Sequence, residues 1–362
     1  MQKRVLLSTR NRETYLSSIV SLANSTQKLK RAALNDFDKF CNVQFHTKDS
    51  EGVIVELLQN DNVDQPLDIL QSWINWNVDK RQPNGLRTYF NHLNDYFYYR
   101  GIKLDVRDTK TLKFPKKIKR REYPLKLEEI QRIITPAKYK KKAMYLVLIS
   151  SGMRIDEVLR LQRKHLDLGT ERIKVTIPGE FTKSGQERIT FLSKEASKYN
   201  LRNIRSLDPE DLVWGQNPRW DNNVTTEDQN FARLCDNADL GMKYPSGTRM
   251  ITIHSFRSYF ITKGNKIDDF GFGHAIAGHD HYMKNYERYT EEELLELYLK
   301  LESDLFVFDL TKQQEENASL KKQLREENKE LREKLELIEI ESKKKDEKNE
   351  KRFRMLEKSN LN

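Results

Sequence analysis

Apolar residues recur at helical spacing through the first hundred positions of the chain. Six of them each lie three or four positions from another member of the set: Leu86, Tyr89, Phe90, Leu93, Tyr96 and Phe97. This spacing is typical of the buried face of one amphipathic helix. A turn at Pro83-Asn84-Gly85 precedes the helix, and Gly101 marks its end. We therefore expect residues from about 10 to 101 to be helical, with the aromatic stripe inside a helix-bundle core.

The pattern changes between residues 125 and 308. The segment AMYLVLISSGMRIDEVLRLQRKHLDL reads as two helices that break at Ser150-Ser151-Gly152. The stretches ERIKVTIPG and ERITFLS alternate between apolar and polar residues, as strands do, around a turn that contains Lys183-Ser184-Gly185. Helical spacing returns from about Ile253. The whole pattern predicts a mainly α fold with a small β-sheet in an α+β domain.

A dense basic run lies between Pro115 and Pro124. Its charged members are Lys116, Lys117, Lys119, Arg120 and Arg121. Proline at both ends and the absence of an apolar period indicate a linker between two domains. Such a linker could lie along a nucleic-acid backbone, where each neutralised phosphate releases counterions. A solvated hinge is the alternative interpretation.

The residues after Thr311 are almost wholly Glu, Lys, Arg, Gln and Leu. They include a series at steps of four and three: Leu324, Asn328, Leu331, Leu335 and Ile338. Such a heptad series predicts a short parallel coiled coil, in which a single Asn at an a position favours two strands. A lone charged helix is the alternative, because fewer than three heptads associate only marginally.

The length of 362 residues fits two domains and an appendage, at roughly 150 residues per domain. We expect a helical domain at 1–108, a basic linker at 109–123, an α+β domain at 124–310 and a charged helix at 311–362. Lys and Arg number 65 against 55 Asp and Glu, which gives a net charge of +10. This excess favours a polyanionic partner, with nucleic acid ahead of an anionic membrane surface.

Other classes of protein are disfavoured. No stretch approaches the roughly 18 consecutive apolar residues of a membrane-spanning helix. Cys41 and Cys235 form neither a disulfide framework nor a zinc-binding spacing. We expect a cytoplasmic protein that does not associate with membranes and has no metal site, and we interpret both cysteines as structural.

The residues that could act chemically form a set of two arginines, two histidines, a turn lysine and several tyrosines. Two arginines can fork onto one phosphodiester and neutralise charge that builds up in the transition state. A lysine at a turn can protonate a leaving oxygen, and an imidazole can donate to a phosphate oxygen or accept a proton. A tyrosine can attack phosphorus if cations surround it and a proton acceptor is positioned nearby.

Four segments resemble the motifs of tyrosine recombinases of the phage-integrase type. SSGMRIDEVLRL resembles the first box and implies a catalytic Arg154 with a supporting Glu157. TKSGQERITFL resembles the β-turn lysine motif, with Lys183 at the turn. HSFRSYF resembles the His-x-x-Arg box at His254 and Arg257, and AIAGHDHYMKNYERYT resembles the closing segment with His279. The order and approximate spacing agree across the four boxes, and the preceding helical region is similar to the family's core-binding domain.

The position of the nucleophilic tyrosine departs from the usual family pattern. Many members carry it nine residues after the closing histidine, where this chain has Arg288. Tyr282, Tyr286 and Tyr289 lie at offsets of three, seven and ten. The segment that follows is similar to the integrases of archaeal plasmids and viruses, and this likeness implies Tyr286 as nucleophile, with Tyr289 as the reserve candidate.

The resemblance implies a site-specific recombinase that cleaves and rejoins duplex DNA through a 3′-phosphotyrosyl intermediate, without metal or ATP. It implies a C-shaped clamp of two domains and a homotetramer on DNA, and the C-terminal helix could support dimerisation. It also implies a prokaryotic, nucleoid-associated protein that a plasmid or virus could encode. Two alternatives stay open: a type IB topoisomerase-like enzyme that relaxes DNA, and a DNA-binding accessory protein with an idle catalytic centre.

Overall fold

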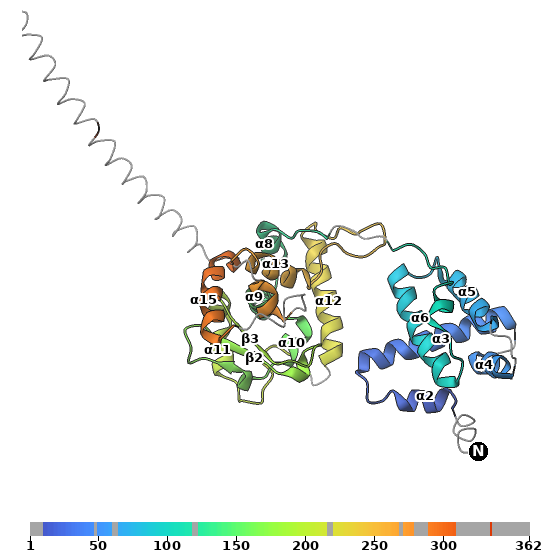
Figure 1. Cartoon of the computed structure of the whole chain (residues 1–362). Coiled ribbons are helices and arrows are strands. Elements are labelled where there is room, and N and C mark those ends of the chain that lie inside the picture. The colour runs from blue at the N-terminus through green and yellow to red at the C-terminus, as the bar shows by residue number, and fades with distance from the viewer. Residues whose placement is uncertain are drawn as a thin grey trace, which may run out of the picture. The chain divides into compact units, whose positions relative to one another are not determined.

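The computed structural model describes residues 10–46, 49–59, 64–117, 122–215, 220–267, 271–278, 289–308 and position 334. The chain divides into two compact units, Met1–Arg121 and Glu122–Asn362 (Figure 1). The described residues are mainly helical with one three-stranded antiparallel sheet, which confirms the predicted fold class. The heptad series of the tail lies outside the described residues, and the one described residue after 308 is Lys334, which is helical and exposed.

The described part of the first unit is built from helices that surround an aromatic core. The helices are α2 (Arg12–Ser18), α3 (Asn24–Phe45), α4 (Ser50–Gln59), α5 (Gln65–Asn77), α6 (Pro83–Arg100) and α7 (Val106–Thr109). Figure 1 shows α6 lying across α3. The rings of Phe37 and Phe97 meet edge to face between these helices, with centroids 5.6 Å apart.

The aromatic stripe predicted for residues 86–97 is confirmed as part of this core. Five of its six side chains are buried, and the sixth, Tyr89, is half-buried against them. Pro83 occupies the first turn of α6, and Gly101 ends the helix at φ 102°, in the left-handed region. Helical periodicity therefore predicted this helix, and Gly101 predicted its C-terminal end. The turn predicted at Pro83-Asn84-Gly85 was wrong: these residues form the first turn of α6, where proline is favoured because its missing N–H needs no partner.

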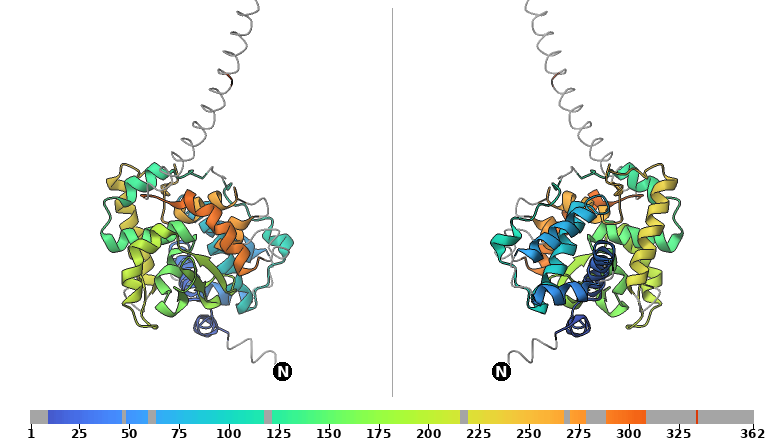
Figure 2. Two further views of the ribbon diagram at one scale, coloured as in Figure 1. Left: turned by 90° about the vertical axis from the view of Figure 1, so that its left-hand side faces the viewer. Right: turned by 90° about the vertical axis from the view of Figure 1, so that its right-hand side faces the viewer.

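The second unit combines helices with the sheet. Its elements are α8 (Leu127–Ile134), α9 (Tyr139–Ser151), α10 (Ile155–Arg160), the 3-10 turn η1 (Arg163–His165), β1 (Leu166–Asp167), β2 (Lys174–Ile177), η2 (Gly179–Phe181), β3 (Arg188–Phe191), α11 (Lys194–Arg205), α12 (Trp220–Asn237), α13 (Ser255–Gly264), α14 (Phe272–Ala277), α15 (Glu291–Glu302) and η3 (Ser303–Leu305). Figures 1 and 2 both show α15 beside the strands.

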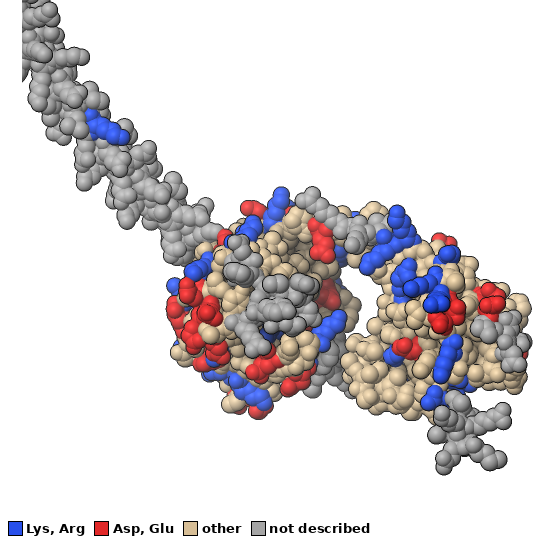
Figure 3. All heavy atoms as spheres, in the orientation of Figure 1, with Lys and Arg blue, Asp and Glu red and all other residues tan. Residues whose placement is uncertain are grey.

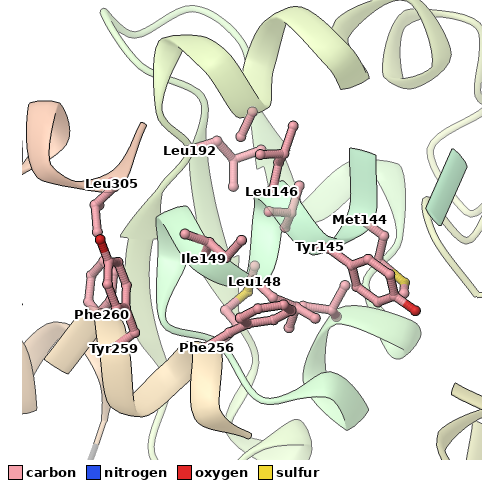
Figure 4. Packing of buried hydrophobic residues seen from close by; sticks show 14 of the residues in the cluster. Met144, Tyr145, Leu146, Leu148, Ile149, Leu192, Phe256, Tyr259, Phe260 and Leu305 are labelled. Carbon is pink, nitrogen blue, oxygen red and sulfur yellow. The ribbon is translucent and has the colours of Figure 1, made fainter. Parts of the chain in front are cut away.

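Helix α9 runs through the core of the second unit. Every residue from Ala143 to Ser151 is buried, so this helix is covered on all sides rather than along one stripe. Figure 4 shows side chains of α9 between Leu192 on one side and Phe256 of α13 on the other. The C-terminal end of α9 is therefore held inside the unit by several other elements.

The two predicted strands are confirmed as an antiparallel pair. In β2 and β3, Lys174 lies opposite Phe191 and Ile177 opposite Arg188.

One expectation for this region was wrong. The second helix of the segment ends at Arg160, and HLDL instead forms the end of η1 and the strand β1, which pairs with β2. A two-residue edge strand depends on its partner, so local periodicity did not reveal it.

Cys41 and Cys235 are both buried and unpaired. Burial raises the pKa of each thiol to about 12, so both behave as neutral packing groups. No helix among the described residues combines the length and apolar character needed to cross a membrane.

Gly152 permits the sharp exit from α9. Its φ of 63° lies in the left-handed region, which favours glycine. A Cβ atom built here would lie 2.4 Å from the Phe260 ring. Both the backbone conformation and the adjacent ring therefore require a residue without a side chain.

Substitution of this glycine should destabilise the second unit. We expect Gly152→Ala to lower the free energy of unfolding by about 2–5 kcal/mol, from left-handed strain of about 1–2 kcal/mol and overpacking of about 1–3 kcal/mol. Gly247→Ala is the control, because Gly247 also has positive φ but a Cβ there meets nothing within 4 Å. Urea denaturation followed by tryptophan fluorescence compares them, and equal destabilisation would contradict the role given to Phe260.

Candidate active site

Arg154 occupies the start of helix α10, immediately after the turn that ends α9. Its backbone N–H donates to Glu157 Oε2 at 2.8 Å, and its Nη1 donates to Glu157 Oε1 at 2.9 Å. A glutamate three residues into a helix can cap the N-terminus in this way. The Arg154 side chain is one-quarter exposed. Glu157 therefore orients it from the buried side, and its exposed part is accessible to a ligand.

Glu157 is fully buried and also receives Arg188 from strand β3. Arg188 donates from Nη1 to Oε1 at 3.1 Å and from Nη2 to Oε2 at 2.6 Å. Burial alone would raise the pKa of Glu157, but the Arg188 hydrogen bonds and charge, together with Arg154, lower it below its usual value. One ionised carboxylate therefore holds two arginines in a fixed arrangement.

Arg257 of α13 lies in the same cluster and is 1% exposed. Its Nη1 donates to the Gly152 carbonyl at 2.7 Å and to the Ala277 carbonyl at 2.6 Å. Its Nε and Nη2 find no hydrogen-bond partner among the described residues. Burial lowers the pKa of Arg257 to about 10, and the nearby charges of Arg154 and Arg188 add to that effect.

The end of α14 meets this cluster. Gly278 caps α14 with a φ of 67°, and a Cβ atom there would lie 2.6 Å from Cδ of Arg188. Ala277 accepts the hydrogen bond from Arg257. The chain thus enters the segment that follows residue 278 directly beside two of the three clustered arginines.

The structure brings three predicted site residues together and places others around them. Arg154, Glu157 and Arg257 lie in one cluster. His254 is exposed at the N-terminal cap of α13, one helical turn before Arg257. Lys183 is exposed in the turn of the β2–β3 hairpin, where Gly185 has a φ of 71°.

The remaining predicted residues are less fully described. His279, Tyr286, Lys119, Arg120 and Arg121 lie outside the described residues. Lys116 and Lys117 are exposed, in a part of the first unit without helix or strand. The reserve candidate Tyr289 is half-buried, and its ring meets that of Phe272 edge to face at 6.5 Å.

Arg188 is the member of the cluster that sequence reasoning passed over. Because strand side chains alternate, Arg188 shares a face with buried Thr190. An arginine on the inward face of a short strand was the signal that could have identified it. Among the described residues, no group of three or more His, Cys, Asp or Glu is arranged to hold a metal ion.

The cluster, viewed as a whole, suits an anion. Two guanidinium groups, those of Arg154 and Arg188, bind the buried carboxylate of Glu157. The charge of Arg257 lies close enough to interact with both, and two nitrogen atoms of Arg257 have no partner in the described part of the chain. Mutual repulsion among the arginines falls when a negative group binds between them. The arrangement can therefore orient a phosphate and stabilise additional negative charge on it.

The chain is similar to known proteins in its family match and in its fold. Residues 121–293 match the model of the phage integrase family, whereas no curated protein sequence matches the chain. The fold is similar to a lambda integrase dimer bound to a COC′ core site, at 11% identity over 77% of this chain and 78% of that chain, with a TM-score of 0.54.

Two further solved structures are similar. One is a lambda integrase tetramer bound to a Holliday junction, at 12% identity over 77% of this chain and 79% of that chain, with a TM-score of 0.54. The other is the XerH site-specific recombinase bound to its difH substrate, at 15% identity over 78% of this chain and 82% of that chain, with a TM-score of 0.50. At these identities the three similarities establish a shared fold.

The ionised state of Glu157 should stabilise the second unit in a pH-dependent way. Because the folded pKa lies below the ordinary value of 4.5, this stabilisation is present above that value and is lost as pH falls through the folded pKa. We expect Glu157→Gln to lower the free energy of unfolding by about 3 kcal/mol at pH 6, since it leaves buried cations uncompensated. The difference from wild type should narrow at pH 3.

Glu210→Gln is the matched control for this measurement. Glu210 pairs with Lys164 at 2.7 Å, but both side chains are exposed, and exposed pairs contribute little. Urea denaturation at both pH values compares the variants. A Glu157→Gln effect that is equally large at pH 3 and pH 6 would contradict the role of the ionised carboxylate.

Proposed function

Residues 121–293 belong to the phage integrase family, and from this premise we propose that the chain is a site-specific tyrosine recombinase. It would cleave and rejoin duplex DNA through a 3′-phosphotyrosyl intermediate. The observation that supports the proposal is the pairing of Arg154 and Arg188 with buried Glu157. Arg257 lies near this pair, and its Nε and Nη2 have no partner among the described residues.

In the proposed mechanism, Arg154 and Arg257 bind the scissile phosphate. Arg257 offers its Nε and Nη2 groups, because its Nη1 is already engaged by two carbonyls. Arg154 reaches the phosphate from the part-exposed side of the cluster. Charge on the phosphate increases as the tyrosine attacks, so a preorganised excess of positive charge favours the transition state over the ground state.

The covalent step exchanges one phosphate ester for another. The Tyr286 hydroxyl oxygen bonds to phosphorus, the bond from phosphorus to the 5′-oxygen breaks, and Lys183 gives that oxygen a proton. The tyrosine proton passes to the imidazole of His254, and His279 donates a hydrogen bond to the phosphate. A second 5′-hydroxyl then attacks the phosphotyrosyl bond and releases Tyr286. The intermediate conserves the energy of the phosphodiester, so strand joining needs no ATP.

The partner that we propose is duplex DNA with a specific recombination site. The similar lambda integrase structures hold a dimer on a core site and a tetramer on a Holliday junction. By analogy, four protomers of this chain would act on two duplexes. The exposed side chains of Lys116 and Lys117 would lie along the DNA backbone with Lys119, Arg120 and Arg121. The heptads of residues 311–362 would help to pair protomers. The protein would act in the cytoplasm of a prokaryote, and a plasmid or virus would encode it.

The nucleophile can be tested by trapping the covalent intermediate. The recombination site is first found by incubating wild type with fragmented DNA of the genome that encodes it and sequencing the fragments that form protease-sensitive adducts. A nicked duplex of that site should then form an adduct with wild type but not with Tyr286→Phe, which lacks the attacking oxygen. Denaturing gel electrophoresis measures the adduct.

Tyr289→Phe is the matched control, because its ring packs against Phe272 and phenylalanine preserves that contact. It should trap DNA as wild type does. Adduct formation by Tyr286→Phe but not by Tyr289→Phe would make Tyr289 the nucleophile. An absence of adduct with wild type on every fragment would contradict the recombinase proposal.

The role of Lys183 can be separated from that of the arginines by changing the leaving group. We expect Lys183→Ala to slow cleavage by roughly 10²- to 10⁴-fold on ordinary DNA, the usual range for a general acid. Replacement of the bridging 5′-oxygen by sulfur should restore most of the rate, because a thiolate leaves without being protonated. Arg154→Ala should stay slow on both substrates. If sulfur does not restore Lys183→Ala, then Lys183 is not the acid.

A further inference from the structure

Three successive backbone carbonyls at the end of α9 are each held by a side chain from a different element. Ser150 O accepts from the Tyr298 hydroxyl of α15 at 2.8 Å, and Ser151 O accepts from Thr190 Oγ1 of β3 at 2.9 Å. Gly152 O accepts from Arg257 of α13 at 2.7 Å. Carbonyls at a helix C-terminus lack intrahelical partners, so these side chains satisfy and also fix them.

Tyr298 is well suited to a fixed donor role. It is fully buried, and its ring centroid lies 5.4 Å from that of Phe191 in β3. Burial, with a smaller effect of Glu302, raises the pKa of Tyr298 well above its usual value, so the hydroxyl keeps its proton. The ring can reach Ser150 only while α15 is packed against the strands.

The end of α15 is anchored by a buried ion pair. Glu302, one helical turn after Tyr298, accepts from Arg172 Nε at 2.7 Å and from Arg172 Nη2 at 2.8 Å. Both side chains are 7% exposed. Glu195 of α11 then accepts the backbone N–H groups of Val307 and Phe308 at 2.7 and 2.6 Å. This end of α15 is therefore bound to its own unit.

The outer face of α15 is acidic. Glu291, Glu292, Glu293 and Glu296 are all exposed, and Figure 3 shows Asp and Glu gathered where Figure 1 places α15. A polyanion such as DNA is repelled by such a face. We therefore expect any effect of α15 on DNA cleavage to act through its inner face, where Tyr298 lies.

We propose that Tyr298 and Thr190 are positioning residues for Arg154. By holding the Ser150 and Ser151 carbonyls, their hydroxyls fix the turn from which Arg154 begins α10, two residues after Gly152. Helix α15 follows Tyr286 in the sequence, and its packing in the second unit brings the Tyr298 hydroxyl to the carbonyl of Ser150. This inference rests on the proposed recombinase function, because it assigns the two hydroxyls to the same phosphate site.

The first test compares two buried tyrosines of the same unit. Tyr298→Phe removes the hydrogen bond to Ser150 but keeps the ring. Tyr145→Phe is the control, because the Tyr145 hydroxyl is buried and has no hydrogen-bond partner among the described residues. Single-turnover cleavage of the nicked duplex should slow roughly 10- to 100-fold in Tyr298→Phe, since a shift of about 1 Å at a reacting group has effects of that size. DNA affinity should change less than about twofold, and Tyr145→Phe should match wild type.

The second test uses the strand residue. Thr190→Val removes the hydroxyl at nearly constant volume, whereas Thr190→Ser keeps it. We expect Thr190→Val to slow the cleavage step without weakening DNA binding, and Thr190→Ser to restore the wild-type rate. If both variants slow cleavage equally, packing rather than the hydrogen bond is responsible, and the proposal for Thr190 is overturned.

A double-mutant cycle shows whether Tyr298 acts through Arg154. If it does, Tyr298→Phe should add little further slowing in an Arg154→Lys background, because residues that act as a unit are not additive. The same slowing in both backgrounds would indicate a general structural role and overturn the inference. If wild type and Tyr298→Phe cleave DNA at the same rate, the positioning role of Tyr298 is overturned, but the recombinase proposal is not. A wild type that forms no adduct would instead refute both.

Discussion

The candidate site depends on one buried carboxylate. Glu157 lies between Arg154 and Arg188 and accepts both side chains as well as a backbone N–H of its own helix. Without a counter-charge, guanidinium groups packed this closely would repel one another and draw water into the core. The Glu157 carboxylate orients Arg154 and Arg188. Arg257 lies near them, and its burial together with their charges lowers the pKa of Arg257. The cluster retains an excess of positive charge that an incoming phosphate can balance.

That local balance needs support from elements far apart in the sequence. Helix α9 ends in the turn at Gly152 that precedes Arg154. Strand β3 supplies Arg188 and Thr190, and α13 supplies Arg257. Helix α15 closes the arrangement through Tyr298. The surrounding core is closely packed, as Gly152 beside Phe260 and Gly278 beside Arg188 demonstrate. A preorganised charged site requires such close packing around it, because the reaction rate falls steeply when the reacting groups are displaced by about 1 Å.

Local patterns in the sequence predicted those features that depend on local chemistry. The stripe of α6 and its glycine cap follow from helical periodicity, and the β2–β3 hairpin follows from alternation around a turn. Arg154 and Arg257 were indicated by short motifs. Alternation along the strand could have marked Arg188 as inward-facing, but it could not predict the partner of Arg188, which is Glu157. The strand β1 could not be predicted either, because it forms only by pairing with β2. The hydrogen bonds of Tyr298 and Thr190 could not be predicted from local patterns either, because each joins residues far apart in the sequence.

The central proposal is that one of three candidate tyrosines forms a covalent bond to DNA. The three candidate tyrosines fall in different tryptic peptides: Tyr282 in residues 267–284, Tyr286 in residues 285–288 and Tyr289 in residues 289–300. Mass spectrometry of the trapped adduct, after digestion with trypsin and nuclease, therefore identifies the linked residue directly. The account predicts a 3′-nucleotide on the peptide of residues 285–288. A nucleotide joined through its 5′ end, or joined to a peptide without a candidate tyrosine, would contradict it.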